Sequence, residues 1–133
     1  MKTPADEDIL FLKIETFLEE YNNHQKLLDI LNENGAHLHI KDGYGNSLLH
    51  IAAMKGNLSI MSFLLEKNMD INGLNKSGKT PLHFAAKHSN LEVSIFLLKN
   101  GADYTIRDDS GRTFLESASR DKRVILKNHV KKT

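Results

Sequence analysis

The hydrophobic residues of this chain fall into short stretches at helical spacing, separated by polar segments. Residues 58–65 (LSIMSFLL) and residues 91–98 (LEVSIFLL) repeat apolar side chains every three or four positions, as a helix with one buried face does. Residues 9–21 (ILFLKIETFLEEY) show the same spacing, with glutamates on the opposite side. The apolar side of this stretch consists of Leu10, Ile14, Phe17, Leu18 and Tyr21. The pattern predicts an all-α chain.

A second regularity lies at a larger scale, because the sequence superimposes on itself after a shift of 33 residues. The matching sets include Gly45, Gly78 and Gly111; Ser47, Thr80 and Thr113; Leu49, Leu82 and Leu115; and Leu31, Leu64 and Leu97. We predict a single domain, residues 1–133, of about four stacked units at 7–41, 42–74, 75–107 and 108–133. The first and last units are diverged, as the ends of a stack are when their outer faces meet water.

Each unit also carries signals for where its helices begin and end. Thr80 suits an N-cap and Pro81 suits the first helical position. Thr113 and Glu116 have the spacing of a capping box. The residues expected to end helices in a left-handed conformation are Gly35, Asn68 and Gly101. These signals place the start of the first helix of each unit at Ser47, Thr80 and Thr113.

Together these residues resemble the ankyrin repeat family over about residues 24–126. The matching motifs are Thr80-Pro81-Leu82-His83, Ala85-Ala86, Leu97-Leu98 and Gly101-Ala102-Asp103. The resemblance implies an ankyrin-repeat solenoid of helix-turn-helix pairs joined by β-hairpin loops, including two degenerate capping repeats. It also implies that His50 and His83 bond back to the cap hydroxyl and across to the next unit. Family members of this size are non-enzymatic binding modules, among them regulators of larger complexes and effectors that intracellular bacteria place in host cells.

Residues 73–80 (GLNKSGKT) match the phosphate-binding loop G-x-x-x-x-G-K-[ST] letter for letter. The repeat explains the match, because the glycine and the hydroxyl recur in the equivalent residues 45–47 and 111–113, whereas the lysine does not. A phosphate loop also follows a buried strand, and the residues before Gly73 are polar. We therefore predict no nucleotide site, no catalytic residues and no cofactor.

The composition fits a soluble protein: 40% of the 133 residues are hydrophobic, 26% are charged and none is cysteine. No apolar run reaches the roughly 20 residues that span a bilayer, and the start MKTPADED is acidic where a signal peptide is basic. We expect a cytoplasmic monomer, with the nucleus or a host cytosol as alternative locations. Charge is uneven, with a net of −5 over residues 1–33 and +5 over residues 111–133.

In this family, partners bind the concave surface made by the hairpin tips and the first helices. Positions there that vary between units are the candidates for partner binding. They are Tyr44, Asn46, Met54, Lys55, Lys76, Lys79, Lys87, His88, Arg112 and Arg120. Tyr44 and Met54 supply apolar contact area, as binding hot spots do. The basic residues favour an acidic segment of another protein.

Other positions were considered for nucleic-acid binding, metal binding and modification. The basic C-terminal stretch offers nucleic-acid binding as an alternative function, although no aromatic residue lies among its bases for stacking. His37 and His39 alternate along an extended segment but lack a third ligand, so we predict no metal site. Asn72 lies in a pattern that resembles the substrates of asparaginyl hydroxylases and is a candidate for hydroxylation. Phe11 and Leu12 are expected to be exposed on the first helix.

Overall fold

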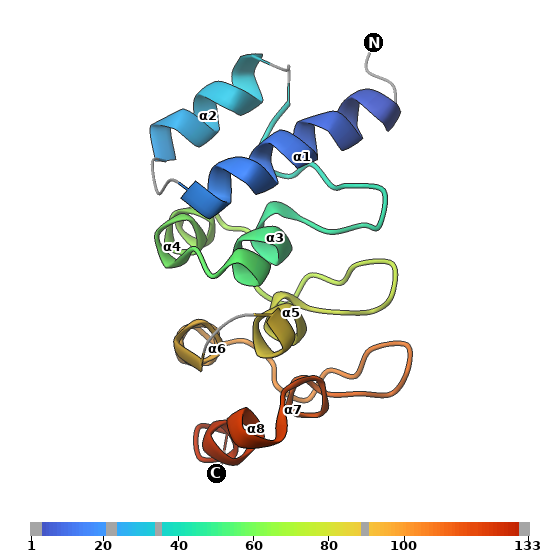
Figure 1. Cartoon of the computed structure of the whole chain (residues 1–133), viewed down its shortest axis with the longest axis vertical. Helices are drawn as coiled ribbons and strands as arrows, with labels where there is room; N and C mark the ends of the chain where they lie inside the picture. The colour runs from blue at the N-terminus through green and yellow to red at the C-terminus, as the bar shows by residue number, and fades with distance from the viewer. Residues whose placement is uncertain (1–3, 21–23, 34–35, 89–90, 131–133) are drawn as a thin grey trace.

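The computed structural model describes residues 4–20, 24–33, 36–88 and 91–130 of the 133-residue chain. Helices within these residues follow one another in pairs, and the pairs stack in a single column (Figure 1). The helices are α1 (Pro4–Glu20), α2 (His24–Glu33), α3 (Leu48–Lys55), α4 (Leu58–Glu66), α5 (Pro81–His88), α6 (Leu91–Lys99), α7 (Phe114–Ser117) and α8 (Arg120–Lys127). Odd-numbered helices form one row and even-numbered helices the other (Figure 1). The predicted all-α solenoid is confirmed.

Three extended arms, residues 36–47, 69–80 and 102–113, leave the column on one side and lie above one another (Figure 1). We call them the first, second and third arm. Each leads from an even-numbered helix to the next odd-numbered one. Backbone amides join neighbouring arms, because Lys76 N–H donates to the carbonyl of Tyr44 and Asp109 N–H donates to that of Ser77. Within the described residues, pairing in the arms amounts to one isolated antiparallel bridge, between Lys41 and Ser47.

The predicted helix boundaries agree with the local geometry wherever the structure describes them. The Thr80 hydroxyl accepts the backbone N–H of His83, and Pro81 begins α5. Asn68 and Gly101 have φ angles of 66° and 91°, in the left-handed region that ends a helix. Gly35 lies outside the described residues.

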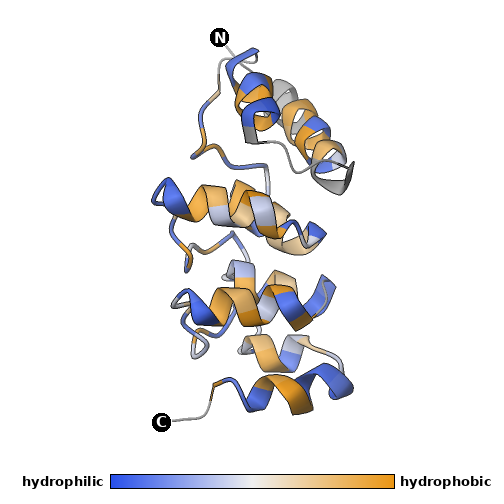
Figure 2. Cartoon of the chain, turned by 90° about the vertical axis from the view of Figure 1, so that its left-hand side faces the viewer, coloured by the Kyte–Doolittle hydropathy of each residue, from blue (hydrophilic) through white to orange (hydrophobic). Residues whose placement is uncertain are grey.

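Small side chains between the odd-numbered helices allow the pairs to lie close together. Ala52, Ala53, Ala85 and Ala86 are fully buried where α3 packs against α5. The even-numbered helices fill the other half of the core with larger side chains: Ile60, Met61 and Leu64 on α4, and Val93 and Leu97 on α6. Seen from the even-numbered helices, hydrophobic residues concentrate along the helices, while their ends and the connecting segments are more hydrophilic (Figure 2).

The N-terminal helix differs from the expectation at one residue. Phe11 was expected to be exposed but is only 2% exposed, whereas Leu12 is 64% exposed, as expected. Leu10, Phe11 and Ile14 lie at i, i+1 and i+4, within one broad buried face of α1, which contacts α2 and α3. Leu12 lies about 200° around the helix from Leu10 and therefore outside this face. The side chain of Leu18 and residue Tyr21 lie outside the described part of the chain.

The last helix pair carries polar residues where the earlier pairs bury apolar or small ones. Ser119 stands at the position of Ala53 and Ala86, and Lys127 at that of Met61 and Ser94. Both Ser119 and Lys127 are exposed, whereas their equivalents are buried. This end of the column therefore tolerates water, as the end unit of a stack does.

Candidate functional site

Two histidines tie consecutive units together. The Nδ1 atom of His50 accepts the backbone N–H of Ser47 at 3.1 Å, so the proton lies on Nε2, which donates to the carbonyl of Lys79 at 2.8 Å. His83 repeats this arrangement with Thr80 and the carbonyl of Arg112. Burial lowers the pKa of both histidines. Both ring nitrogens therefore form hydrogen bonds within and between units, which is the structural role that the family resemblance implies. We call the residues that hold the units together in this way the frame.

A column of Asx residues holds the turn at the tip of each arm. Asp42, Asn75 and Asp108 each accept, through one side-chain oxygen, the N–H groups two and four residues further on. The role of these three residues was not predicted, although they recur at the 33-residue period. These turns fix where the intervening side chains, including Tyr44, are presented.

The second side-chain atom of Asn75 and of Asp108 reaches the preceding unit, whereas that of Asp42 accepts from Asn46 on the same arm. Asn75 Nδ2 donates to Asn46 Oδ1 at 2.8 Å, and Lys79 Nζ donates to Asp108 Oδ2 at 2.6 Å. The hydrogen bond from Lys79 is the largest of the effects that hold the pKa of Asp108 well below its usual range. Asn46 and Lys79 are predicted to bind a partner, and this stays a prediction. The structure shows that both side chains also form hydrogen bonds between units.

These contacts also explain the look-alike phosphate loop. Lys79 is paired with Asp108, and Thr80 is buried at the start of α5. Gly78 has a φ of +75°, and a Cβ added there would lie 2.6 Å from Oδ1 of Asp109. Gly78 is therefore needed by the turn, Lys79 forms the ion pair between units, and the Thr80 hydroxyl caps α5.

A hollow of about 250 Å³ lies where the arms meet the odd-numbered helices. Residues of three units line it: Tyr44 and Asn46; Asn75, Ser77, Lys79, His83, Phe84, Lys87 and His88; and Ser117. The Phe84 ring makes edge-to-face contacts with the rings of His50 and His88, with centroids 5.3 and 6.0 Å apart. Phe84 is not among the residues predicted to bind a partner.

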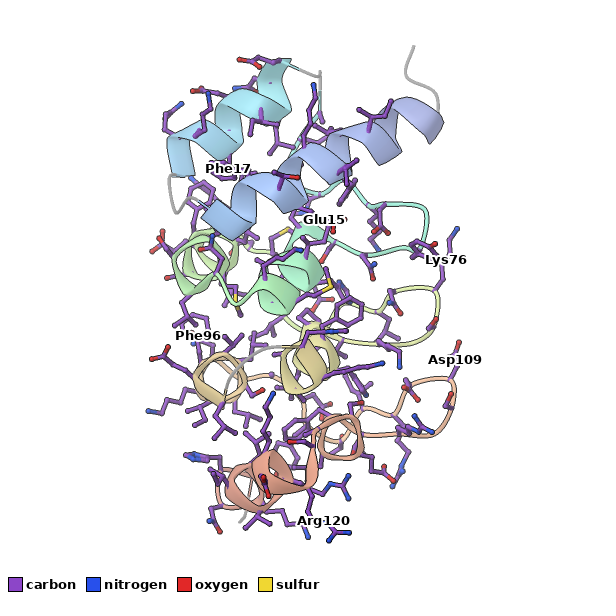
Figure 3. All side chains as sticks on the ribbon, in the orientation of Figure 1. Glu15, Phe17, Lys76, Phe96, Asp109 and Arg120 are labelled. Atoms are coloured by element: carbon purple, nitrogen blue, oxygen red, sulfur yellow. The ribbon has the colours of Figure 1, made fainter. Side chains whose placement is uncertain are left out.

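The predicted binding residues are only partly brought together. Tyr44, Asn46, Lys79, Lys87 and His88 line the hollow, and Tyr44 is 76% exposed. The remaining candidates do not line it: Met54, Lys55, Lys76, Arg112 and Arg120. Figure 3 shows Lys76 at the tip of the second arm and Arg120 at the far C-terminal end of the column.

Positive charge gathers at one edge of the hollow. The pKa of His88 is lowered first by burial and then by Lys87, Lys122 and Lys55. These lysines come from α5, α8 and α3, so three units contribute to one electropositive region. His88 therefore loses its proton more readily than a free histidine, while the lysines carry the charge.

The candidates for metal binding and for hydroxylation lie on the arms: His37, His39 and Asn72. The Nδ1 atom of His37 accepts the N–H of His39, and the described residues contain no group of three or more potential metal ligands. Asn72 Oδ1 accepts the N–H of Asp103 in the next unit at 2.8 Å. Its hydroxylation stays a prediction.

No helix in the described ranges is long and apolar enough to cross a membrane.

The stacked helix pairs, the histidine ties and the projecting arms define a helical repeat solenoid that presents a hollowed surface. A family model described as ankyrin repeats (3 copies) matches residues 18–108. The chain belongs to the ankyrin repeat family. Ankyrin repeats are generally protein–protein interaction modules and are typically non-enzymatic.

Proposed function

We propose that this chain binds a segment of another protein in the hollow between its arms and its odd-numbered helices, with Tyr44 as the main anchor. The observation that carries the proposal is the exposure of Tyr44, 76%, at the rim of a hollow whose floor contains Phe84. A large aromatic side chain costs free energy to leave in water and gains it when a partner covers it. The turn held by Asp42 fixes the backbone from which this side chain projects.

Charge supports an acidic character for the part of the partner that enters the hollow. Lys87 and His88 line it, and Lys55 and Lys122 lie near enough to lower the pKa of His88. No carboxylate is among the lining residues of the described chain. Electrostatic complementarity of this kind speeds encounter and disfavours basic partners.

A peptide-display selection tests the proposal without knowledge of the natural partner. Random peptides are selected on the wild-type protein, and the enriched ones are measured by fluorescence anisotropy on variants. Tyr44→Ala is expected to weaken binding by about tenfold or more, as truncation of an anchor does. Tyr104→Ala is the matched control, because Tyr104 is also an exposed tyrosine but lies on the third arm, outside the hollow. Equal effects of the two substitutions would show that the hollow is not the binding site.

A further inference from the structure

Tyr44 lies between two hollows whose walls carry opposite charge. We propose that the bound segment is bipolar: a large apolar residue with a basic residue on one side and acidic residues on the other. This inference rests on the proposed function and specifies the chemistry of the partner along the binding site.

The second hollow, of about 450 Å³, lies between α1 and the first arm. Its apolar part is formed by Leu12, the edge of Phe11 and the Tyr44 ring. Leu12 and Tyr44 are two of the most exposed large apolar side chains of the described residues. A hydrophobic side chain placed here removes apolar surface of both from water, which favours binding.

The charged part of this second hollow is acidic. Glu15 of α1 and Asp42 of the first arm line it, and none of its other lining residues is charged. The Asp42 carboxylate is fixed in place by hydrogen bonds from Tyr44 N–H, Asn46 N–H and Asn46 Nδ2. Figure 3 shows Glu15 on α1, on the side toward α3. A basic group of the partner therefore has two carboxylates to meet on this side of Tyr44.

The hollow on the other side of Tyr44 has the opposite sign. Lys87 and His88 line it, while the charge of Lys79 is balanced by Asp108. Tyr44 is the one residue that lines both hollows among the described residues. A segment that crosses its ring meets the carboxylates of Glu15 and Asp42 on one side and the ammonium group of Lys87 on the other. The equivalent positions of the other arms are Ser77 and Ser110, so the first arm alone carries an aromatic ring at this position.

Three synthetic fluorescent peptides of equal length test this arrangement, each with a central tryptophan in a Gly/Ser background. One carries lysines on one side of the tryptophan and glutamates on the other, the second carries glutamates on both sides, and the third lysines on both. Wild-type protein is expected to bind the bipolar peptide at least fivefold more tightly than either uniform peptide. Binding by the all-glutamate peptide as tight as by the bipolar one would overturn the inference.

Charge reversal at Glu15 provides the decisive variant. Glu15→Lys is expected to abolish the preference for the bipolar peptide over the all-glutamate one, because the new ammonium offsets the remaining carboxylate of Asp42. Glu15→Gln is expected to weaken the preference without abolishing it, because Asp42 keeps its charge. Glu92→Lys, the same charge change on the exposed face of α6, serves as the control and is expected to leave the preference intact. Circular dichroism confirms that each variant is folded.

The same peptides separate the failure of this inference from that of the proposed function. If Tyr44→Ala weakens the binding of the all-glutamate peptide and that peptide binds best, the hollow is the site but the partner is uniformly acidic. If Tyr44→Ala changes the binding of none of the three, both proposals are wrong. A preference for the bipolar peptide that survives Glu15→Lys would also contradict the inference, because the acidic hollow would not be its cause.

Discussion

The ion pair between Lys79 and Asp108 offers a direct measurement of how neighbouring units are held together. The Asp108 side chain is 1% exposed and that of Lys79 is 35% exposed, with Nζ and Oδ2 2.6 Å apart. The other carboxylate oxygen of Asp108 accepts the N–H groups of Ser110 and Arg112. Asp108→Asn keeps an acceptor for these two amides but turns an NH₂ group toward the ammonium. We expect a loss of about 1–2 kcal/mol, a charged hydrogen bond discounted for the exposure of Lys79.

A substitution at Lys79 removes the donor of this ion pair instead of the acceptor. Lys79→Asn leaves the buried Asp108 oxygen without its ammonium partner, and we expect a loss of about 1–3 kcal/mol. The double variant Lys79→Asn/Asp108→Asn recreates the pair that the protein already uses one unit earlier, where Asn75 Nδ2 donates to Asn46 Oδ1. The two losses are therefore expected not to add. The coupling energy should be about 1–2 kcal/mol, in the range found for contacting residues.

Urea unfolding followed by far-UV circular dichroism gives the free energy of unfolding of the wild type and the three variants. Arg107→Ala is the control, because the Arg107–Glu116 ion pair has a distance of 3.6 Å and both side chains are more than half exposed. Its loss of stability should be smaller than that of either Lys79→Asn or Asp108→Asn, although Arg107 also donates to the carbonyl of Gly111. Losses from Lys79→Asn and Asp108→Asn that add within about 0.5 kcal/mol would refute the assignment of Lys79 to the frame.

Two further predictions concern the frame. Burial lowers the pKa of His50 and His83 in the folded protein, so as the pH falls below the ordinary value of 6.5 the unfolded chain takes up protons first. The free energy of unfolding should therefore decrease from about pH 6.5 downward, and urea titrations at several pH values should show a weaker decrease for His83→Gln. Gly101→Ala should cost about 1 kcal/mol for its left-handed φ alone, and Gly78→Ala should cost more, because its Cβ would also meet the third arm at Asp109. Equal thermal shifts for the two glycine variants would contradict the close approach of the arms.

The frame of the fold could be predicted from the sequence because it depends on contacts that recur. Thr80, Pro81 and His83 act within one turn of chain, and the 33-residue period shows that the same contacts form again. Left-handed residues at Asn68 and Gly101 are equally local. Local features of this kind can be predicted without knowing which residues of other units lie nearby.

The exposure of Phe11 could not be predicted in the same way. It lies next to Leu12 in a run of four apolar residues, and a run of that kind does not show which side packs on α3. The direction is set by the docking of α1 on a neighbouring unit, where Phe11 is buried and Leu12 remains at the rim of the acidic hollow. Repeat periodicity offers no help, because α1 lacks the motif of the other odd-numbered helices.

Variation between units has two different physical causes, and the sequence alone does not separate them. Asn46 and Lys79 differ because their partners in the following unit, Asn75 and Asp108, differ with them. A change at one position is compensated at another, so such positions belong to the frame. Tyr44 changes to serine in the later arms with no compensating neighbour, and its ring stays exposed. An exposed aromatic ring gains free energy when a partner covers it, whereas the charge of Lys79 is already balanced by Asp108, and this is why we propose the first arm, and not the lysine of the look-alike loop, as the centre of the interface.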